Sequence, residues 1–364
     1  LQPFDMADVT LAEGPFLHAQ KMTEAYLLKL QPDRMLHNFR VNAGLKPRAP
    51  VYGGWESEPL WDEINCHGHT LGHYLSACAL AYRSTRDRRY RQRIDHIARE
   101  LAACQAAAGS GLVCAFPKGP ALMAAHLKGE PITGVPWYTL HKVYAGLRDA
   151  ALLADSEASR AVLIRLADWG VVATRPLSDA AFEKMLATEH GGMNEVYADL
   201  YAMTGNQEYR TLAARFSHKA LLEPMARGQD HLDGLHANTQ VPKAVGFQRV
   251  FEATGEPRYR DAAAFFWRTV ALTRSFATGG HGDNEHFFPM ADVGTRVFSA
   301  KGSETCCQHN MLKLSRMLFL RDPRQLGRFR RIVGGVAIAV AILLLYALAK
   351  QPLALATLPR FVDW

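Results

Sequence analysis

The sequence lacks the features that mark several classes of protein. Its 364 residues contain only six cysteines, without regular spacing, which excludes a disulfide framework. The first four lie among apolar or small neighbours and are expected to be buried. Residues 1–20 have no basic stretch followed by an apolar run, so no signal peptide is expected there. Hydrophobic residues make up 48% and charged residues 21%, as in an ordinary globular protein.

The body of the chain also lacks a strong excess of charge of one sign. The formal net charge is +7, but residues 321–364 hold seven Lys or Arg against two Asp or Glu, a net charge of +5. Only +2 is left for residues 1–320. This body has no basic footprint for nucleic acid, and we expect no nucleic-acid partner.

A helix–turn–helix pattern recurs between about residue 69 and residue 320. The first helices are apolar nearly all round, as buried inner helices are, and start near residues 69, 138, 191, 239 and 304. The second helices carry a polar, often Arg-rich face. The turns TGNQEY and TGEPRY match each other, and Gly205 and Gly255 are placed to end a helix.

Helical hairpins at uneven intervals form either an open solenoid or a closed toroid. Long loops rich in Gly, His and acidic residues precede the inner helices, and they favour the toroid with these loops on one functional face. We therefore expect an all-α fold, an (α/α) barrel of helical hairpins over residues 1–320. It should be incomplete within this chain, because the repeats stop as the fifth one begins.

Residues 332–349, IVGGVAIAVAILLLYALA, form a long run without a charge. Eighteen such residues reach the lower limit for crossing a bilayer, which predicts a transmembrane helix and membrane association; a buried helix of a further domain is the alternative. The basic linker 321–331 would place the barrel on the cytoplasmic side. Residues 350–364 would form a short tail.

The stretch GSETCCQHN, residues 302–310, puts an acid, two adjacent cysteines and a histidine at a helix start. A metal site, a nucleophile and an ordinary helix start are all open interpretations. Glu304 and Cys306 could face one ion, with Cys307 and His309 as alternative ligands, but a closed zinc site needs four. Equally, Glu304 and Thr305 would favour a helix N-terminus by charge and by capping.

Glu285 lies in a Gly-rich stretch, GGHGDNEHFFP, that ends in aromatic residues. A carboxyl group beside apolar rings has a raised pKa, which suits a general acid. The alternative is a solvated acidic residue in a loop.

Histidines gather at the junctions between the loops and the predicted helices. They are His67, His69, His73, His141, His190, His236, His281 and His286. His69 and His73 have the spacing of metal-binding helices, but the sequence between them lacks the glutamate of HExxH. Binding of sugar hydroxyls, or a place in a polar core, fits them better.

Together these motifs resemble those of the β-L-arabinofuranosidase superfamily, which includes glycoside hydrolase families 127 and 146. The similarity runs from about Val9 to Phe319 and includes YGGWES, GHTLGHYLSACALAY, EHGGMNEVYADLYAMTGN, HANTQVPKAVG, GGHGDNEHF and ETCCQHNMLKLSRMLF. It implies an (α/α)6 barrel followed by β-sandwich domains. It also implies removal of β-linked L-arabinofuranose, with retention of configuration, from an arabinose-containing glycan.

The resemblance further implies roles for single residues and a zinc cofactor. Glu285 corresponds to the general acid/base, and Glu304 and Cys306 correspond to two zinc ligands, with Cys307 as an alternative. The sugar-binding positions correspond to His73, His190 and either Gln240 or His236.

The nucleophile of the superfamily is a zinc-bound cysteine in a second Cys–Cys pair further along, and no cysteine follows Cys307 here. Such a thiolate attacks the anomeric carbon while the acid protonates the leaving oxygen. With this ligand set incomplete, we expect an inactive chain. Two rival hypotheses are a membrane-tethered carbohydrate-binding pseudoenzyme and another (α/α)-barrel sugar enzyme that works without zinc.

Overall fold

The computed structural model describes residues 1–57 and 66–323. In these two stretches all regular elements are helical, and the β pairing consists of isolated bridges. The all-α prediction is therefore confirmed for this part of the chain. The chain divides into two compact units, which we name the N-terminal unit (Phe4–Phe216) and the C-terminal unit (Ser217 onward, with Leu1–Pro3).

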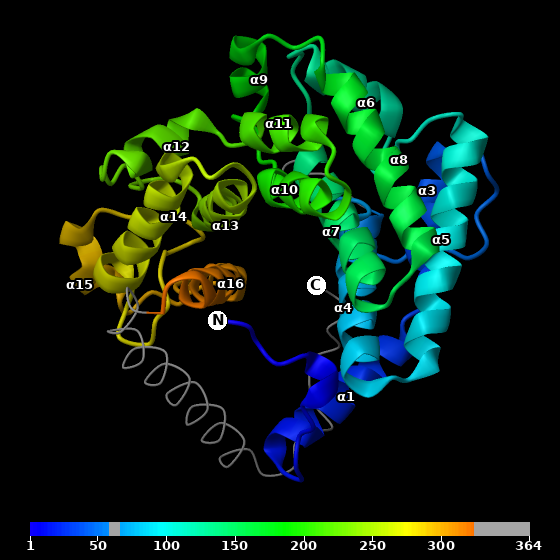
Figure 1. Ribbon diagram of the computed structural model, residues 1–364, viewed down its shortest axis with the longest axis horizontal. Helices are drawn as coiled ribbons and strands as arrows, with labels where there is room; N and C mark the ends of the chain where they lie inside the picture. Colours follow the sequence, from blue (N-terminus) through cyan, green and yellow to red (C-terminus); the bar gives the residue numbers. More distant parts are fainter. Residues whose placement is uncertain (58–65, 324–364) are drawn as a thin grey trace. The chain divides into compact units, whose positions relative to one another are not determined.

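The N-terminal unit contains three helical hairpins (Figure 1). α4 (His69–Thr85) packs on α5 (Arg88–Ala108), α7 (Pro136–Leu153) on α8 (Glu157–Thr174), and α10 (Met193–Thr204) on α11 (Gln207–Arg215). The shorter elements are η1 (Met6–Asp8), α1 (Pro15–Lys29), α2 (Pro32–Met35), α3 (His37–Asn42), η2 (Gly54–Glu56), α6 (Gly119–Leu127) and α9 (Asp179–Met185).

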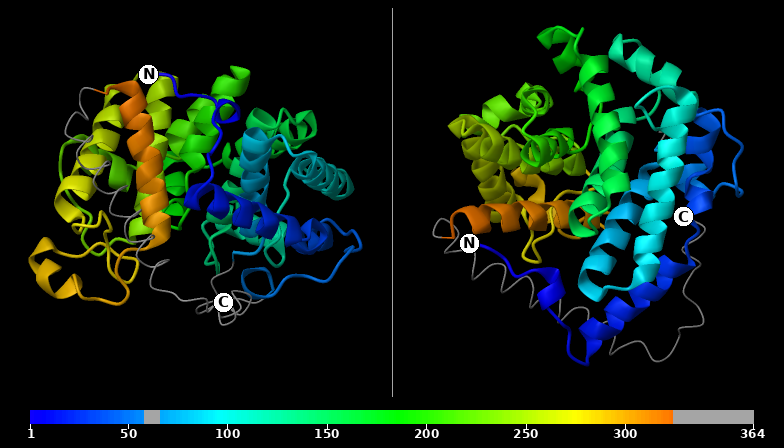
Figure 2. Two further views of the ribbon diagram at one scale, coloured as in Figure 1. Left: turned by 90° about the horizontal axis from the view of Figure 1, so that it is seen from below. Right: turned by 45° about the vertical axis from the view of Figure 1, so that its right-hand side comes forward.

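The C-terminal unit contains a fourth hairpin and the opening helix of a fifth. α13 (Ala237–Thr254) packs on α14 (Pro257–Thr269), and α16 (Thr305–Arg321) lies beside α13 in every view (Figures 1 and 2). The remaining elements are α12 (Lys219–Ala226), η3 (Val270–Arg274), η4 (Met290–Asp292) and α15 (Val293–Arg296).

The hairpins begin where the sequence predicts them. The inner helices start at His69, Pro136, Met193, Ala237 and Thr305, within two residues of the predicted positions. α13 buries eleven of its 18 residues, whereas α14 buries six of 13 along one face. The distinction between inner and outer helices is therefore confirmed, while closure into a barrel and the domain limits 1–320 stay predictions.

Gly205 and Gly255 end their helices as predicted. Both take left-handed φ angles, 73° and 75°, and their amides donate to the carbonyls of Tyr201 and Phe251 at 2.7 Å. Glycine takes this conformation without the steric cost that a Cβ atom brings.

α4 and α7 touch backbone to backbone through two glycines. A Cβ atom on Gly72 would lie 2.0 Å from the carbonyl oxygen of Lys142, and one on Gly146 would lie 2.4 Å from the carbonyl oxygen of Gly72. No side chain separates the two helices at this crossing. The contact therefore fixes their distance, and with it the positions of the histidines and aromatic residues at their N-terminal ends.

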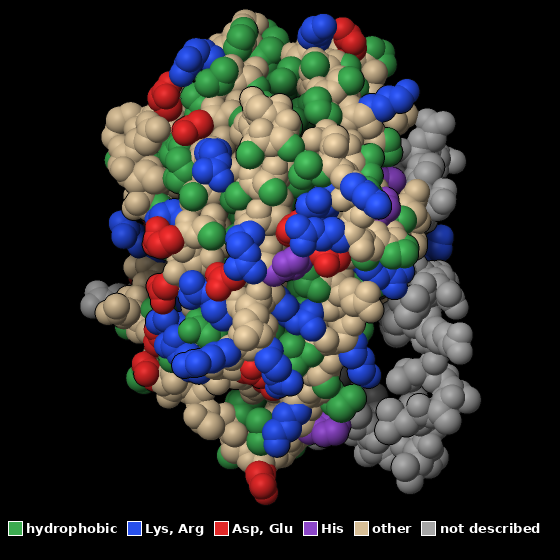
Figure 3. Space-filling model, turned by 90° about the vertical axis from the view of Figure 1, so that its right-hand side faces the viewer, with side chains coloured by type: hydrophobic (Ala, Val, Ile, Leu, Met, Phe, Trp, Pro, Cys, Tyr) green, Lys and Arg blue, Asp and Glu red, His purple; other side chains and the backbone are tan. Residues whose placement is uncertain are grey.

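The outer surface of α5 and α8 carries charges of both signs. Figure 3, which views the molecule from this side, shows Lys and Arg side chains interspersed with Asp and Glu. On α5, Arg91 pairs with Asp95 at 2.9 Å, and Arg89 pairs with Asp87, which precedes the helix, at 2.6 Å. The Arg-rich face predicted for the outer helices is thus a solvated and partly paired surface.

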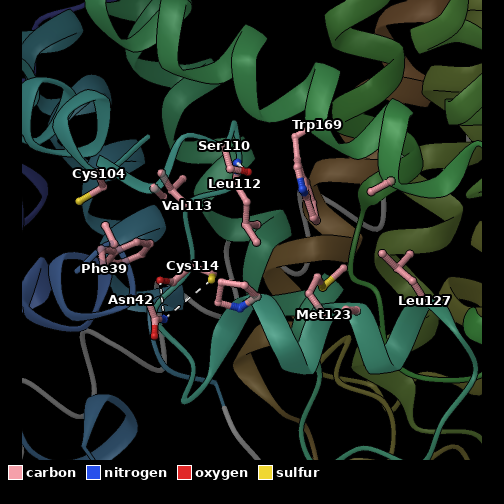
Figure 4. Close-up of a pocket in the computed structure, with 15 residues that line it drawn as sticks. Phe39, Asn42, Cys104, Ser110, Leu112, Val113, Cys114, Met123, Leu127 and Trp169 are labelled. Carbon is pink, nitrogen blue, oxygen red and sulfur yellow. Dashed lines mark hydrogen bonds between the residues drawn. The ribbon is translucent and has the colours of Figure 1, made fainter. Parts of the chain in front are cut away.

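An apolar pocket of about 250 Å³ lies in the N-terminal unit, between α3, α5, α6 and α8 (Figure 4). Phe39, Leu112, Met123 and Trp169 are among the side chains that line it. Asn42 closes one side by donating to the carbonyl oxygens of Cys114 and Phe116 at 2.9 and 3.0 Å. None of the predicted site residues lines this pocket, so it is a packing feature of the unit.

The six cysteines are free thiols, and all but Cys306 are buried. The expectation that the first four are buried is therefore confirmed. In the described ranges no helix combines the length and the apolar character needed to cross a bilayer. The predicted transmembrane helix 332–349, the tail 350–364 and the linker beyond residue 323 lie outside these ranges.

We expect Gly72→Ala to destabilise the fold by about 1–3 kcal/mol, because the added methyl group forces α4 and α7 apart. Gly53→Ala is the matched control, since a Cβ atom there meets nothing within 4 Å. Urea unfolding of the two variants measures the difference. An equally small effect in both would contradict the close contact.

Candidate active site in the C-terminal unit

Backbone hydrogen bonds hold Glu285 between the segments that lead into α13 and α16. The amide of Ala237 donates to the carbonyl of Glu285 at 2.7 Å, and the amide of Asn284 donates to the carbonyl of Lys301 at 2.9 Å. The three loops HANTQ, GGHGDNEHF and GSETCC therefore meet within this unit. Their predicted convergence is confirmed for these three.

Asn284 and Glu285 both have left-handed backbone conformations, with φ angles of 47° and 65°. Asparagine adopts this region readily, whereas a glutamate there carries a steric cost of about 1–2 kcal/mol. Strain of this kind persists only where the surrounding structure enforces it, and it gathers at functional sites. The backbone of Glu285 is thus strained at the candidate site, although Arg86 and Lys118 elsewhere in the described residues share this conformation.

The carboxylate of Glu285 pairs with His236. Nε2 of His236 lies 2.9 Å from Oε2 of Glu285. The amide N–H of Thr239 donates to Nδ1 of the same ring at 3.1 Å, which makes Nδ1 an acceptor. In the neutral ring the proton must therefore be on Nε2, where it is donated to the carboxylate.

The apolar surroundings predicted for Glu285 are not found. Its side chain is 48% exposed, whereas Phe287 and Phe288 are buried. Phe287 stacks instead on the buried ring of His281, with 5.5 Å between ring centroids, and burial lowers the pKa of His281 to about 4. The aromatic residues belong to the core beneath the loop, because the left-handed turn directs Glu285 away from them.

Asp283 anchors the loop that carries Glu285. It accepts a hydrogen bond from Oγ of Ser299 at 2.5 Å and one from the guanidinium of Arg296 at 2.7 Å. These bonds lower the pKa of Asp283. The carboxylate thereby ties the segment after α15 to the candidate site.

Glu304, Cys306 and Cys307 lie at the start of α16. Glu304 occupies the N-cap position of α16, as the interpretation as a helix start predicts, but its side chain accepts no bond from the helix amides. The thiol of Cys307 instead donates to Oε2 of Glu304 at 3.5 Å. Burial, with the carboxylate of Glu304 second, raises the pKa of Cys307, while Cys306 is exposed.

These donors do not make a zinc site by themselves. Among the residues that the structure describes, no three or more His, Cys, Asp or Glu side chains gather closely enough to hold a metal. A tetrahedral site needs four ligands. The described residues therefore supply at most a part of the zinc centre that the sequence resemblance implies.

In the N-terminal unit, His69 joins an aromatic cluster at the start of α4. Its ring lies 5.4 Å from that of Trp55 and 5.8 Å from that of His73, and Nδ1 contacts the carbonyl oxygen of Cys66 at 2.7 Å. Burial lowers the pKa of His69 to about 4. Burial also raises the pKa of Glu56, whose carboxylate accepts from the amide of Gly68 at 2.8 Å.

The two predicted sugar-binding histidines of this unit differ in exposure. His73 is exposed on α4. His190 is fully buried, and its Nδ1 lies 3.2 Å from the carbonyl oxygen of Thr188. The predicted site residues thus fall into one group in the N-terminal unit and one in the C-terminal unit.

Sequence reasoning missed two residues that support the site, Thr239 and Lys243. Thr239 was unremarkable because any residue supplies a backbone amide at that position. Lys243 is only 3% exposed and donates to Oε1 of Gln240 at 3.2 Å. A lysine within the apolar run of an inner helix was the signal that could have revealed it.

The family model described as "Beta-L-arabinofuranosidase, GH127 catalytic domain" matches residues 8–326. The chain belongs to this GH127 family. The hairpin architecture and the loops described above are therefore those of a GH127 catalytic domain. No curated protein sequence is significantly similar to the chain.

Two solved GH127 structures share the fold. One is a GH127 β-arabinofuranosidase, with a TM-score of 0.63 and 14% identity over 88% of this chain. The other is a GH127 β-L-arabinofuranosidase from Geobacillus stearothermophilus T6, with a TM-score of 0.58 and 13% identity over 86% of this chain. The match covers 51% and 53% of those chains, so this chain spans about half their length.

We expect Asp283→Asn to lower the thermal midpoint at pH 7. The pKa of Asp283 is lower in the folded protein than the ordinary value of 3.8, so its ionised form stabilises the fold above that pH and the effect is lost as pH falls through the folded pKa. Melting curves from pH 7 to pH 3 should converge for the two proteins. Asp292→Asn, at an exposed neighbour, is the control, and a constant gap between wild type and Asp283→Asn would contradict the assignment.

Proposed function

We propose that this chain carries the sugar-binding and acid/base part of a β-L-arabinofuranosidase active site. The observation that carries the proposal is the pairing of Glu285 with the Nε2–H of His236 at 2.9 Å. A general acid needs a carboxyl group within reach of substrate, and the exposed side chain of Glu285 meets this condition.

His236 determines which oxygen of Glu285 does the chemistry. Its N–H engages Oε2, so Oε1 remains to carry the transferable proton. Protonated Oε1 would donate to the oxygen that leaves the arabinofuranosyl group. In a retaining mechanism the anomeric carbon passes to a nucleophile, which is not among the described residues, and the carboxylate of Glu285 would then accept a proton from the water that displaces that nucleophile. L-Arabinofuranose-containing glycans are the proposed substrates. Of the two alternatives Gln240 and His236, we propose Gln240 as the sugar ligand, because both ring nitrogens of His236 are engaged, and the sugar-binding roles of His73 and His190 stay predictions.

We assign no nucleophile within the described residues. Cys307 is buried, and its thiol donates to Oε2 of Glu304 at 3.5 Å, so it is not presented to a sugar at the surface. This observation favours a second candidate function, a carbohydrate-binding protein that holds arabinosides without hydrolysing them.

Hydrolysis of methyl β-L-arabinofuranoside, whose methoxide leaving group must be protonated to depart, distinguishes the two functions. If the chain turns the substrate over, Glu285→Gln should reduce kcat at least about 100-fold, because proton transfer in general acid catalysis contributes that much. Glu256→Gln, at an exposed acid before α14, is the control and should leave kcat unchanged. Turnover that survives Glu285→Gln would remove Glu285 from the acid/base role.

Isothermal titration calorimetry of the same proteins with methyl β-L-arabinofuranoside measures binding separately from hydrolysis. Binding without turnover would support the carbohydrate-binding function. No binding by the wild type or by Glu285→Gln would contradict both functions.

We propose that Glu304 and Cys306 are zinc donors, and we expect them to bind zinc weakly because two ligands leave the ion open to solvent. Dialysis should therefore remove most of the metal, as measured by elemental analysis, and Cys306→Ser should abolish what remains. Retention of about one equivalent through dialysis would show that the donor set is complete.

A further inference from the structure

Three polar side chains lie along one face of the buried helix α13. They are His236 at its N-cap, Gln240 and Lys243. These positions are four and three residues apart, so they follow one stripe of the helix. Lys243 is 3% exposed and Gln240 is 6% exposed. Burying an ammonium group costs free energy unless the group is hydrogen-bonded. The hydrogen-bond partners of Lys243 are therefore evidence for its role.

Lys243 and His236 together determine the orientation of the Gln240 amide. The ammonium group of Lys243 donates to Oε1 of Gln240 at 3.2 Å, and it can only donate. At the other end, Nε2 of Gln240 donates to the carbonyl oxygen of His236 at 3.3 Å, and that oxygen can only accept. Both partners therefore require the same orientation, and a flipped amide would face a donor with its N–H groups.

The contact between Lys243 and His218 holds the ammonium group at this point. Nζ lies 3.1 Å from Nδ1 of His218, so Nδ1 accepts the bond and the ring is neutral. Burial, assisted by the positive charge of Lys243, lowers the pKa of His218 to about 4. Nδ1 of His218 therefore accepts this bond throughout the neutral pH range. His218, at the N-cap of α12, thereby holds the ammonium group of Lys243 in place.

We propose that Lys243 is a positioning residue that makes Gln240 present an N–H donor to the bound sugar. The amide has two N–H groups, and among the described residues His236 accepts from one of them. The other is available to a sugar oxygen, while Oε1 is held by Lys243. The ligand group that Gln240 recognises is therefore an acceptor, such as a hydroxyl oxygen or the ring oxygen of a furanoside. This inference rests on the function proposed above.

Titration calorimetry with methyl β-L-arabinofuranoside on the full chain carrying Glu285→Gln tests the proposal. Adding Lys243→Met should weaken binding about tenfold, the value of one hydrogen bond that is no longer oriented. Lys219→Met, at an exposed lysine on α12, is the matched control and should leave the affinity unchanged. Equal affinities in the two double variants would overturn the proposal.

Gln240→Glu provides a test that does not depend on the folding of the lysine variant. One oxygen of the new carboxylate keeps the contact with Lys243, now as an ion pair, while the other faces the carbonyl oxygen of His236, so a melting curve is recorded to show that the variant is folded. The N–H donor is lost, however, and the affinity for the arabinofuranoside should fall at least about tenfold. Unchanged affinity would show that the sugar does not use this donor.

The side-chain amide signal of Gln240 separates this inference from the proposed function. In protein labelled with 15N at glutamine side chains, the signal is assigned by its loss in Gln240→Glu. Without any sugar present, Lys243→Met should shift this signal and speed the exchange of its protons with solvent. A signal unchanged by Lys243→Met overturns the positioning role, whereas an absence of sugar binding in every protein overturns the proposed function alone.

Discussion

The hydrogen bond from the Thr239 amide to Nδ1 of His236 does two things at once. It satisfies one of the free amides at the start of α13, which is the ordinary purpose of an N-cap. It also makes Nδ1 an acceptor, so that the ring proton is on Nε2 and faces Glu285. The start of α13 thereby orients the hydrogen-bonded pair of His236 and Glu285.

The stripe of polar residues on α13 shows how the C-terminal unit combines packing with recognition. Most of this helix is buried, and a wholly apolar surface would stabilise it better than a row containing Lys243 and Gln240. Buried polar groups of this kind are tolerated when their hydrogen bonds are satisfied, and they then become rigid. In the proposed function this rigidity fixes whether Gln240 offers a donor or an acceptor to the sugar.

The hairpins and the loops that meet around Glu285 could be predicted because their signals are local. An apolar pattern around the whole helix marks an inner helix, and a glycine at the turn marks its end, as at Gly205 and Gly255. The partners of Glu285 could not be predicted in this way. The pairing with His236 depends on two left-handed residues in succession, and nothing in the sequence indicates that a glutamate adopts this conformation. The same turn explains why the aromatic residues beside it in sequence lie beneath it in space.

The left-handed backbone of Glu285 also has a consequence for how this position can change over generations. Aspartate, asparagine and glycine all fit that conformation better than glutamate does, so mutation at this codon tends to relax the loop. Each of those replacements either shortens the carboxylate by a methylene group or removes it. Under the proposed function, selection for a more stable fold and selection for acid/base chemistry would therefore act on this residue in opposite directions. A lineage freed from the second would be expected to lose the glutamate early.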